Sequence, residues 1–140
     1  MADSKKAENV VNEITATETI EKWLDHKKVR AGKRKAYSQS IDTLVTAVED
    51  GELALDEKNF SLVYKLRHPL ENEITTDRLV FKPKTTSKDI RRKTKGISPT
   101  DIEGRTAAYV SALTGQPINL IEELDTEDND ICSAIAVFFM

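Results

Sequence analysis

The spacing of apolar residues changes twice along this chain, and these changes restrict the fold more than any other feature of the sequence. In residues 35–49 the apolar residues recur at the spacing of one helix face: Tyr37, Ile41, Leu44, Val45 and Val48. Residues 60–67 (FSLVYKLR) instead alternate like a half-buried strand. Helical spacing returns after Pro83. This order predicts an α+β fold in which an antiparallel hairpin sheet packs against several short helices.

The predicted sheet consists of two strands, with a third left open. A second β-rich run, ITTDRLVFK at residues 74–82, follows the first, and residues 71–73 form the turn. We expect His68 and Pro69 to end the first strand, because proline cannot donate a hydrogen bond to a sheet ladder. The sequence does not decide whether residues 53–55 add another strand.

The N-terminal part is predicted to be helical, with residues 1–16 flexible apart from one helical turn near residues 7–14. Thr17 or Thr19 caps a helix that runs to about residue 29, and Gly32 then breaks or bends the chain. Asp50-Gly51 ends the helix of residues 35–49. Trp23 either packs into the core or stays exposed as a partner contact, and packing is favoured. We therefore divide the chain into a helical N-terminal arm (1–50) and a β-hairpin plus helical domain (51–140).

Four helices are predicted after the hairpin. Ser87 caps a short basic helix, and Ser98-Pro99-Thr100-Asp101 starts another, which Gly115 and Pro117 end. Residues 118–124 form a third helix, and Thr126 caps the last. The apolar stripes expected to face inward are Ile102, Thr106, Tyr109, Val110 and Leu113 in one helix, and Ile131, Ile135, Phe138 and Phe139 in the last.

Charge is segregated along the chain although the net charge is only −3. KKVRAGKRK at residues 27–35 contains six cations and no acid, and a second basic cluster spans residues 88–95. Six acids gather between residues 122 and 130. This polarity favours charge-guided association with a partner or with copies of itself.

Groups that carry out catalysis or bind a cofactor are scarce. Neither His26 nor His68 stands at a metal-ligand spacing from another ligand in the sequence, and no glycine motif for nucleotides is present. DTEDND at residues 125–130 lacks the glycine and the distal glutamate of a calcium loop. Cys132 follows an acid in an apolar stretch and is expected to be a buried thiol. We expect no enzyme activity, no cofactor and no metal site.

The cellular location of the protein is predicted from the length of its apolar segments. The first ten residues contain no apolar core of signal-peptide length, and no segment approaches the ~20 apolar residues of a membrane helix. We expect a cytosolic protein without a membrane contact. The basic run at residues 27–35 leaves a second hypothesis open, a small nucleic-acid-binding or regulatory protein, although no recognition helix or stacking platform accompanies it.

Three segments of the second half, in this order, resemble the small tail assembly chaperones of contractile-tailed bacteriophages of the Mu and P2 type. They are FKPKTTSKDIRR at residues 81–92, ALTGQP at 112–117 and IEELDTED at 121–128, followed by an apolar helix with Phe138 and Phe139 near its end. The resemblance covers about half of the chain, residues 74–140.

The resemblance implies a non-enzymatic protein that coats the long helical tape-measure protein in the host cytoplasm before the tail tube polymerises around it. Candidate partner-binding residues are Lys33, Arg34, Lys35, Arg91, Arg92, Phe138 and Phe139. A homo-oligomer is a further expectation, in which the acidic end of one copy meets the basic arm of the next.

Overall fold

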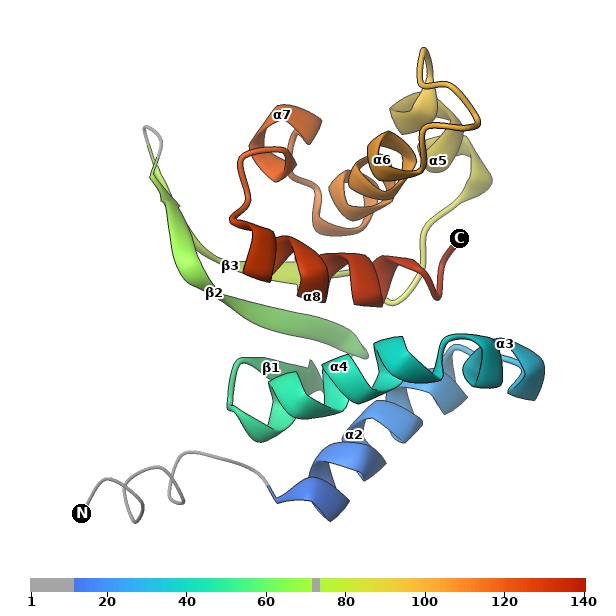
Figure 1. The fold of residues 1–140 in the computed structure, drawn as a ribbon, viewed down its shortest axis with the longest axis vertical. Helices are drawn as coiled ribbons and strands as arrows, with labels where there is room; N and C mark the ends of the chain where they lie inside the picture. Colours follow the sequence, from blue (N-terminus) through green and yellow to red (C-terminus); the bar gives the residue numbers. More distant parts are fainter. Residues whose placement is uncertain (1–11, 72–73) are drawn as a thin grey trace.

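The computed structural model describes residues 12–71 and 74–140, which form seven helices and one antiparallel sheet (Figure 1). The predicted α+β class is confirmed. None of these helices is both long enough and apolar enough to cross a membrane. In chain order the elements are α2 (Glu13–His26), α3 (Ala31–Ala36), α4 (Ser38–Glu49), β1 (Leu53–Asp56), β2 (Ser61–Glu71), β3 (Thr75–Phe81), α5 (Ser87–Thr94), α6 (Ile102–Thr114), α7 (Ile118–Ile121) and α8 (Thr126–Ala136).

The sheet has three strands in the order β1-β2-β3, so the segment that the sequence left open is a strand. The prediction that His68 and Pro69 end the first strand is wrong, because β2 continues through both to Glu71. The register between β2 and β3 shifts between Lys65 and Leu70. Pro69 lies in this irregular stretch, where no ladder partner needs the N–H that proline lacks. Residues 72–73, in the predicted turn, lie outside the described residues.

The first described helix begins earlier than predicted. Oδ1 of Asn12 accepts a hydrogen bond from the backbone N–H of Thr15 at 2.9 Å, so Asn12 is the N-cap rather than Thr17 or Thr19. The helical turn expected near residues 7–14 falls largely on residues 1–11, which lie outside the described residues.

The break between the N-terminal helices also lies elsewhere than predicted. Gly32 lies inside α3; the chain leaves α2 at residues 27–30, where Lys28 has a φ of 58°, and a second break at Tyr37 separates α3 from α4. The predicted end of the second helix is confirmed, since α4 stops before Asp50 and Gly51 adopts a φ of 76°.

The later helices begin at side-chain caps close to the predicted ones. The side chain of Thr86, not Ser87, caps α5, and the side chain of Asp125, not Thr126, caps α8. Asp101, the last residue of the predicted start Ser98-Pro99-Thr100-Asp101, caps α6, so this helix begins only at Ile102, and Gly115 ends it as predicted with a φ of 74°. The third predicted helix is shorter than expected, because α7 ends at Ile121.

The N-terminal helices share one apolar core with the sheet and α8. Trp23 is 1% exposed, so its predicted packing is confirmed, and its ring meets that of Phe138 edge-on at a centroid distance of 5.8 Å. Ile102 is 64% exposed and does not belong to the inward stripe predicted for it. The division at residue 50 stays a prediction. The shared core includes Ala16, Ile20, Leu44, Val48, Leu62, Tyr64, Phe81, Val110, Leu113 and Ile135.

One acidic side chain, that of Asp128 in the first turn of α8, is fully buried. Its Oδ1 accepts hydrogen bonds from the hydroxyl of Tyr64 (2.7 Å) and the backbone N–H of Arg67 (2.9 Å), and its Oδ2 accepts one from the backbone N–H of His68 (3.0 Å). Burial, together with this hydrogen bond, raises the pKa of Tyr64 above its usual value. The carboxylate thus supplies the acceptors that the irregular part of β2 does not find in the sheet.

We expect Asp128→Asn to lower the free energy of unfolding by about 3 kcal/mol, because an amide group presents N–H to at least one of these three donors. The measurement is urea unfolding followed by far-UV circular dichroism. Asp130→Asn is the matched control, since Asp130 is an exposed acid on the same helix, and its effect stays within about 0.5 kcal/mol. Equal losses in both variants would contradict the role assigned to Asp128.

Candidate protein-binding surface

One face of the sheet turns away from the apolar core. Leu62 and Tyr64 in β2 are buried, whereas Val63 between them is partly exposed, and Val80 in β3 is 45% exposed. The strand register places Ala54 opposite Val63 and Val63 opposite Val80. These three side chains therefore form one short apolar row across all three strands, on the face opposite the core.

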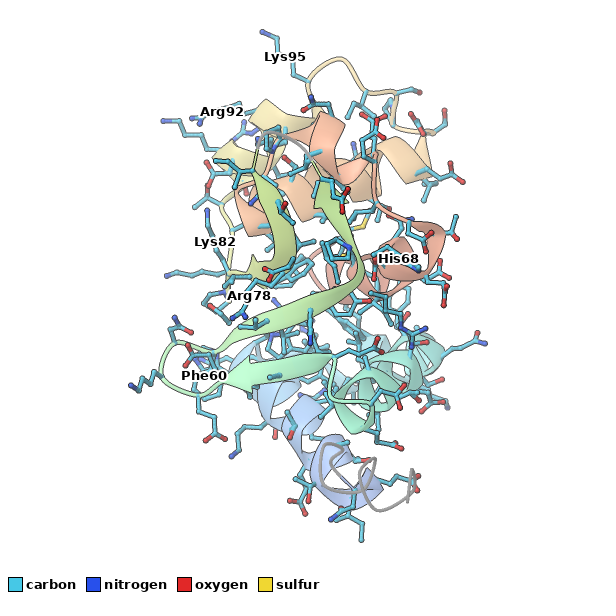
Figure 2. The ribbon with its side chains drawn as sticks, turned by 90° about the vertical axis from the view of Figure 1, so that its left-hand side faces the viewer. Phe60, His68, Arg78, Lys82, Arg92 and Lys95 are labelled. Atoms are coloured by element: carbon cyan, nitrogen blue, oxygen red, sulfur yellow. The ribbon has the colours of Figure 1, made fainter. Side chains whose placement is uncertain are left out.

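Cations flank this row. Lys65 lies opposite Arg78 in the register, both are exposed, and both point to the same face as Val63 and Val80. Like charges in opposite positions repel, and Asp77, whose Oδ1 lies 3.8 Å from Nε of Arg78, offsets part of this repulsion. Lys82 continues the same alternation, and Figure 2 shows Arg78 and Lys82 on one side of the molecule. We call the surface of Ala54, Val63, Lys65, Arg78, Val80 and Lys82 the basic sheet face.

Helix α5 adds further positive charge beside this face. It begins at the side chain of Thr86, which accepts a hydrogen bond from the backbone N–H of Asp89 at 3.1 Å. Arg91 and Arg92, two of the predicted partner-binding residues, are exposed. Among the described residues, neither forms an ion pair within 4.0 Å, and Figure 2 shows Arg92 on the same side as Arg78 and Lys82. These two arginines are free to meet an acidic partner.

The predicted partner-binding cations of the N-terminal part are largely engaged within the chain. Nζ of Lys33 donates to the backbone carbonyls of Phe138 (3.4 Å) and Met140 (3.1 Å). Arg34 pairs with Asp25 at 2.9 Å and donates from Nε to the carbonyl of Val29. Lys35 is exposed. The basic run thus tethers the C-terminal segment instead of extending freely from the fold.

The two predicted partner-binding phenylalanines take part in the same tether. Phe138 is only 3% exposed and lies against the rings of Trp23 and Tyr37, the latter at a centroid distance of 6.0 Å. Phe139 is partly buried and also packs near Trp23. In this conformation the side chain of Phe138 is not available to a partner.

Lys27 lies in an unusual environment within this tether. Its Nζ is 3.4 Å from the ring centroid of Phe139 and 6.0 Å from that of Trp23. Burial, and secondarily repulsion from Lys33, lower the pKa of Lys27 from 10.5 to about 8. The ring of Phe139 favours the charged ammonium group and opposes this lowering.

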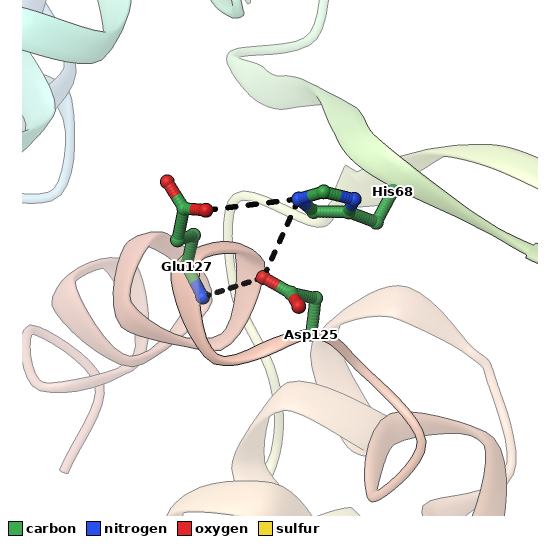
Figure 3. A group of neighbouring side chains, drawn as sticks. All are labelled: His68, Asp125 and Glu127. Atoms are coloured by element: carbon green, nitrogen blue, oxygen red, sulfur yellow. Dashed lines mark hydrogen bonds and ion pairs between the residues drawn. The ribbon is translucent and has the colours of Figure 1, made fainter.

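The structure brings His68 to two acids that are distant in sequence. Its Nε2 lies 3.6 Å from Oδ2 of Asp125 and 3.7 Å from Oε1 of Glu127 (Figure 3). A search for ligand spacings misses this group, because 57 positions separate His68 from Asp125. The only signal in the sequence is the acidic start of the last helix.

The other reactive side chains are occupied by packing. The ring of His26 stacks on Phe60 at a centroid distance of 3.9 Å. Cys132 is fully buried, as predicted, and burial raises the pKa of its thiol, with a further contribution from Asp128. A buried thiol held in its neutral form is a poor nucleophile.

A shallow groove of about 940 Å³ separates the outer part of the β2–β3 hairpin from the α6–α7 connection. Its lining includes the buried Leu70 and Leu120, Ile74, which is 81% exposed, and His68 and Asp125. The groove adjoins the cluster of Figure 3.

No protein-family model, no curated protein and no solved structure matches this chain. A function must therefore be argued from its own sequence and structure.

We expect Lys27→Met to stabilise the chain by about 1 kcal/mol at pH 7, after allowance for the part of the lysine that water still reaches, because a buried charge is removed and the apolar stem is kept. Above pH 8 the unfolded chain binds more protons at this position than the folded chain, so the stability of the original chain rises with pH. The advantage of Lys27→Met should therefore shrink between about pH 8 and pH 10.

Urea unfolding at a series of pH values measures this difference. Lys35→Met, at an exposed lysine of the same basic run, is the control and should show no such narrowing. A constant difference between Lys27→Met and the original chain from pH 7 to pH 10 would contradict the proton balance assigned to Lys27.

Proposed function

We propose that this chain is a tail assembly chaperone of a contractile-tailed phage, a non-enzymatic protein that binds the tape-measure protein in the host cytoplasm. The basic sheet face is the observation that carries the proposal: an apolar row crosses three strands, and exposed cations of β2 and β3 lie beside it. The order of the segments at residues 81–92, 112–117 and 121–128 supports the family assignment.

The chemistry of the basic sheet face suits a helical partner with an apolar stripe bordered by acids. A long tape-measure helix with bare apolar stripes aggregates unless another surface covers them. Val63 and Val80 offer a row for such a stripe, and Lys65 and Arg78 offer charges for the acids beside it. An acidic partner also relieves the repulsion between Lys65 and Arg78, which adds to its binding free energy.

The proposed binding surface differs in part from the residues chosen from the sequence. Arg91 and Arg92 of α5 remain in it, because both are exposed and Figure 2 shows Arg92 on the same side of the molecule as Arg78 and Lys82. Phe138, Lys33 and Arg34 leave it, because they hold the C-terminal segment within the chain. A small patch of this kind gives reversible binding, as a protein that must be displaced by the tail tube requires.

The experiment is co-expression with the tape-measure protein of the same phage, followed by measurement of its soluble fraction and of the dissociation constant of the complex. Val80→Glu places a carboxylate in the centre of the apolar row. We expect it to weaken binding at least about tenfold, or about 1.4 kcal/mol, and to return the tape-measure protein to the insoluble fraction.

Ile14→Glu is the matched control, since it introduces the same charge at an apolar residue of α2 that is 73% exposed. It should bind like the original chain, and both variants should keep its circular dichroism spectrum. A Val80→Glu variant that binds as well as Ile14→Glu would refute the basic sheet face as the binding surface.

The nucleic-acid hypothesis has less support, because Lys27, Lys33 and Arg34 of the basic run contact other parts of the chain. A gel shift with double-stranded DNA tests it directly. We expect no shift at physiological salt, where binding through phosphates is weak. A shift that disappears in a Lys33→Gln, Arg34→Gln, Lys35→Gln triple variant would favour nucleic-acid binding over the chaperone.

A further inference from the structure

Three side chains with metal-ligating atoms meet where β2 passes the start of α8 (Figure 3). They are His68, Asp125 and Glu127, and one ligand atom from each lies within 4.8 Å of the other two. A tetrahedral ion with bonds of about 2.0–2.1 Å holds its ligand atoms about 3.4 Å apart. The separations of 3.6 and 3.7 Å from Nε2 of His68 are close to that value. Small side-chain movements bring all three atoms into bonding range.

Hydrogen bonds hold the backbone of His68 and the carboxylates of Asp125 and Glu127 in place. The backbone N–H of His68 donates to Asp128, which holds this part of β2 against α8. Oδ2 of Asp125 accepts the backbone N–H of Glu127 at 3.0 Å as the helix cap. Oε2 of Glu127 accepts from Nη1 of Arg67 at 2.8 Å, so its other oxygen turns toward His68. Such supporting contacts preset ligand positions in metal sites.

The charge around the cluster is unbalanced. Arg67 is the shared partner of Asp50, Glu52 and Glu127, and Asp125 and Asp128 lie beside the same stretch of β2. The guanidinium group of Arg67 thus pairs with three acids, and the carboxylates of Asp125 and Asp128 add further negative charge nearby. The single positive charge of Arg67 does not balance these carboxylates. A divalent cation at His68 reduces the remaining excess of negative charge.

We propose that His68, Asp125 and Glu127 form a Zn²⁺ site. One imidazole nitrogen and two carboxylate oxygens suit zinc, whereas calcium and magnesium prefer shells made of oxygen alone and larger in number. His68 is 56% and Glu127 58% exposed, so water completes the coordination. The ion ties the irregular part of β2 to the first turn of α8, beside the shallow groove. This site is independent of the basic sheet face.

The test uses the purified full-length chain, stripped of metal, and Zn²⁺ alone as the probe. Competition with a chromophoric zinc chelator gives the stoichiometry and the dissociation constant. We expect one ion per chain, and a loss of affinity of about a hundredfold or more in His68→Ala. Zn²⁺ should also raise the melting temperature of the original chain and leave that of His68→Ala unchanged.

Two further variants separate this site from other zinc ligands in the chain. His26→Ala removes the histidine stacked on Phe60 and should bind like the original chain. Asp125→Asn keeps the helix cap, because asparagine also caps helices, and should weaken zinc binding. Absence of binding at millimolar Zn²⁺, or equal affinity in His68→Ala and the original chain, overturns the proposal.

Discussion

The hydrogen bonds to the buried carboxylate of Asp128 are the interaction on which most of this structure depends. They join α8 to the middle of β2, at the stretch where β2 and β3 shift register. Backbone N–H groups that leave a sheet ladder and become buried must find another acceptor. Because Asp128 supplies it, β2 extends through Pro69, the hairpin reaches past the core, and His68 projects toward Asp125 and Glu127.

A second constraint acts at the opposite end of α8. The C-terminal residues are held by Lys33 through two backbone carbonyls, by the ring of Trp23 against Phe138, and by Lys27 over Phe139. Three of the six cations in residues 27–35, namely Lys27, Lys33 and Arg34, therefore make contacts within the chain. Exposed cations also lie on the basic sheet face and on α5, where the binding surface is proposed.

Several helix ends that depend on neighbours in sequence were predicted well, whereas the capping residues of α5 and α8 were each misplaced by one position. Gly51 and Gly115 end their helices with positive φ angles, and Asp101 caps α6, because each of these contacts spans no more than about one helical turn. The predictions about the end of β2 and the start of α2 were wrong. A proline usually ends a strand, but β2 continues through Pro69. The carboxylate of Asp128, about sixty positions later in the chain, accepts the backbone N–H of the preceding residue, His68.

The sequence by itself determined the α+β class, the burial of Cys132 and the segregation of charge, and it favoured the burial of Trp23, since periodicity and composition set which faces must leave water. Only the tertiary structure decided which cations stay free and which acids meet His68. Such contacts arise when distant segments pack together, and their partners are fixed by the arrangement of the whole core and not by local spacing.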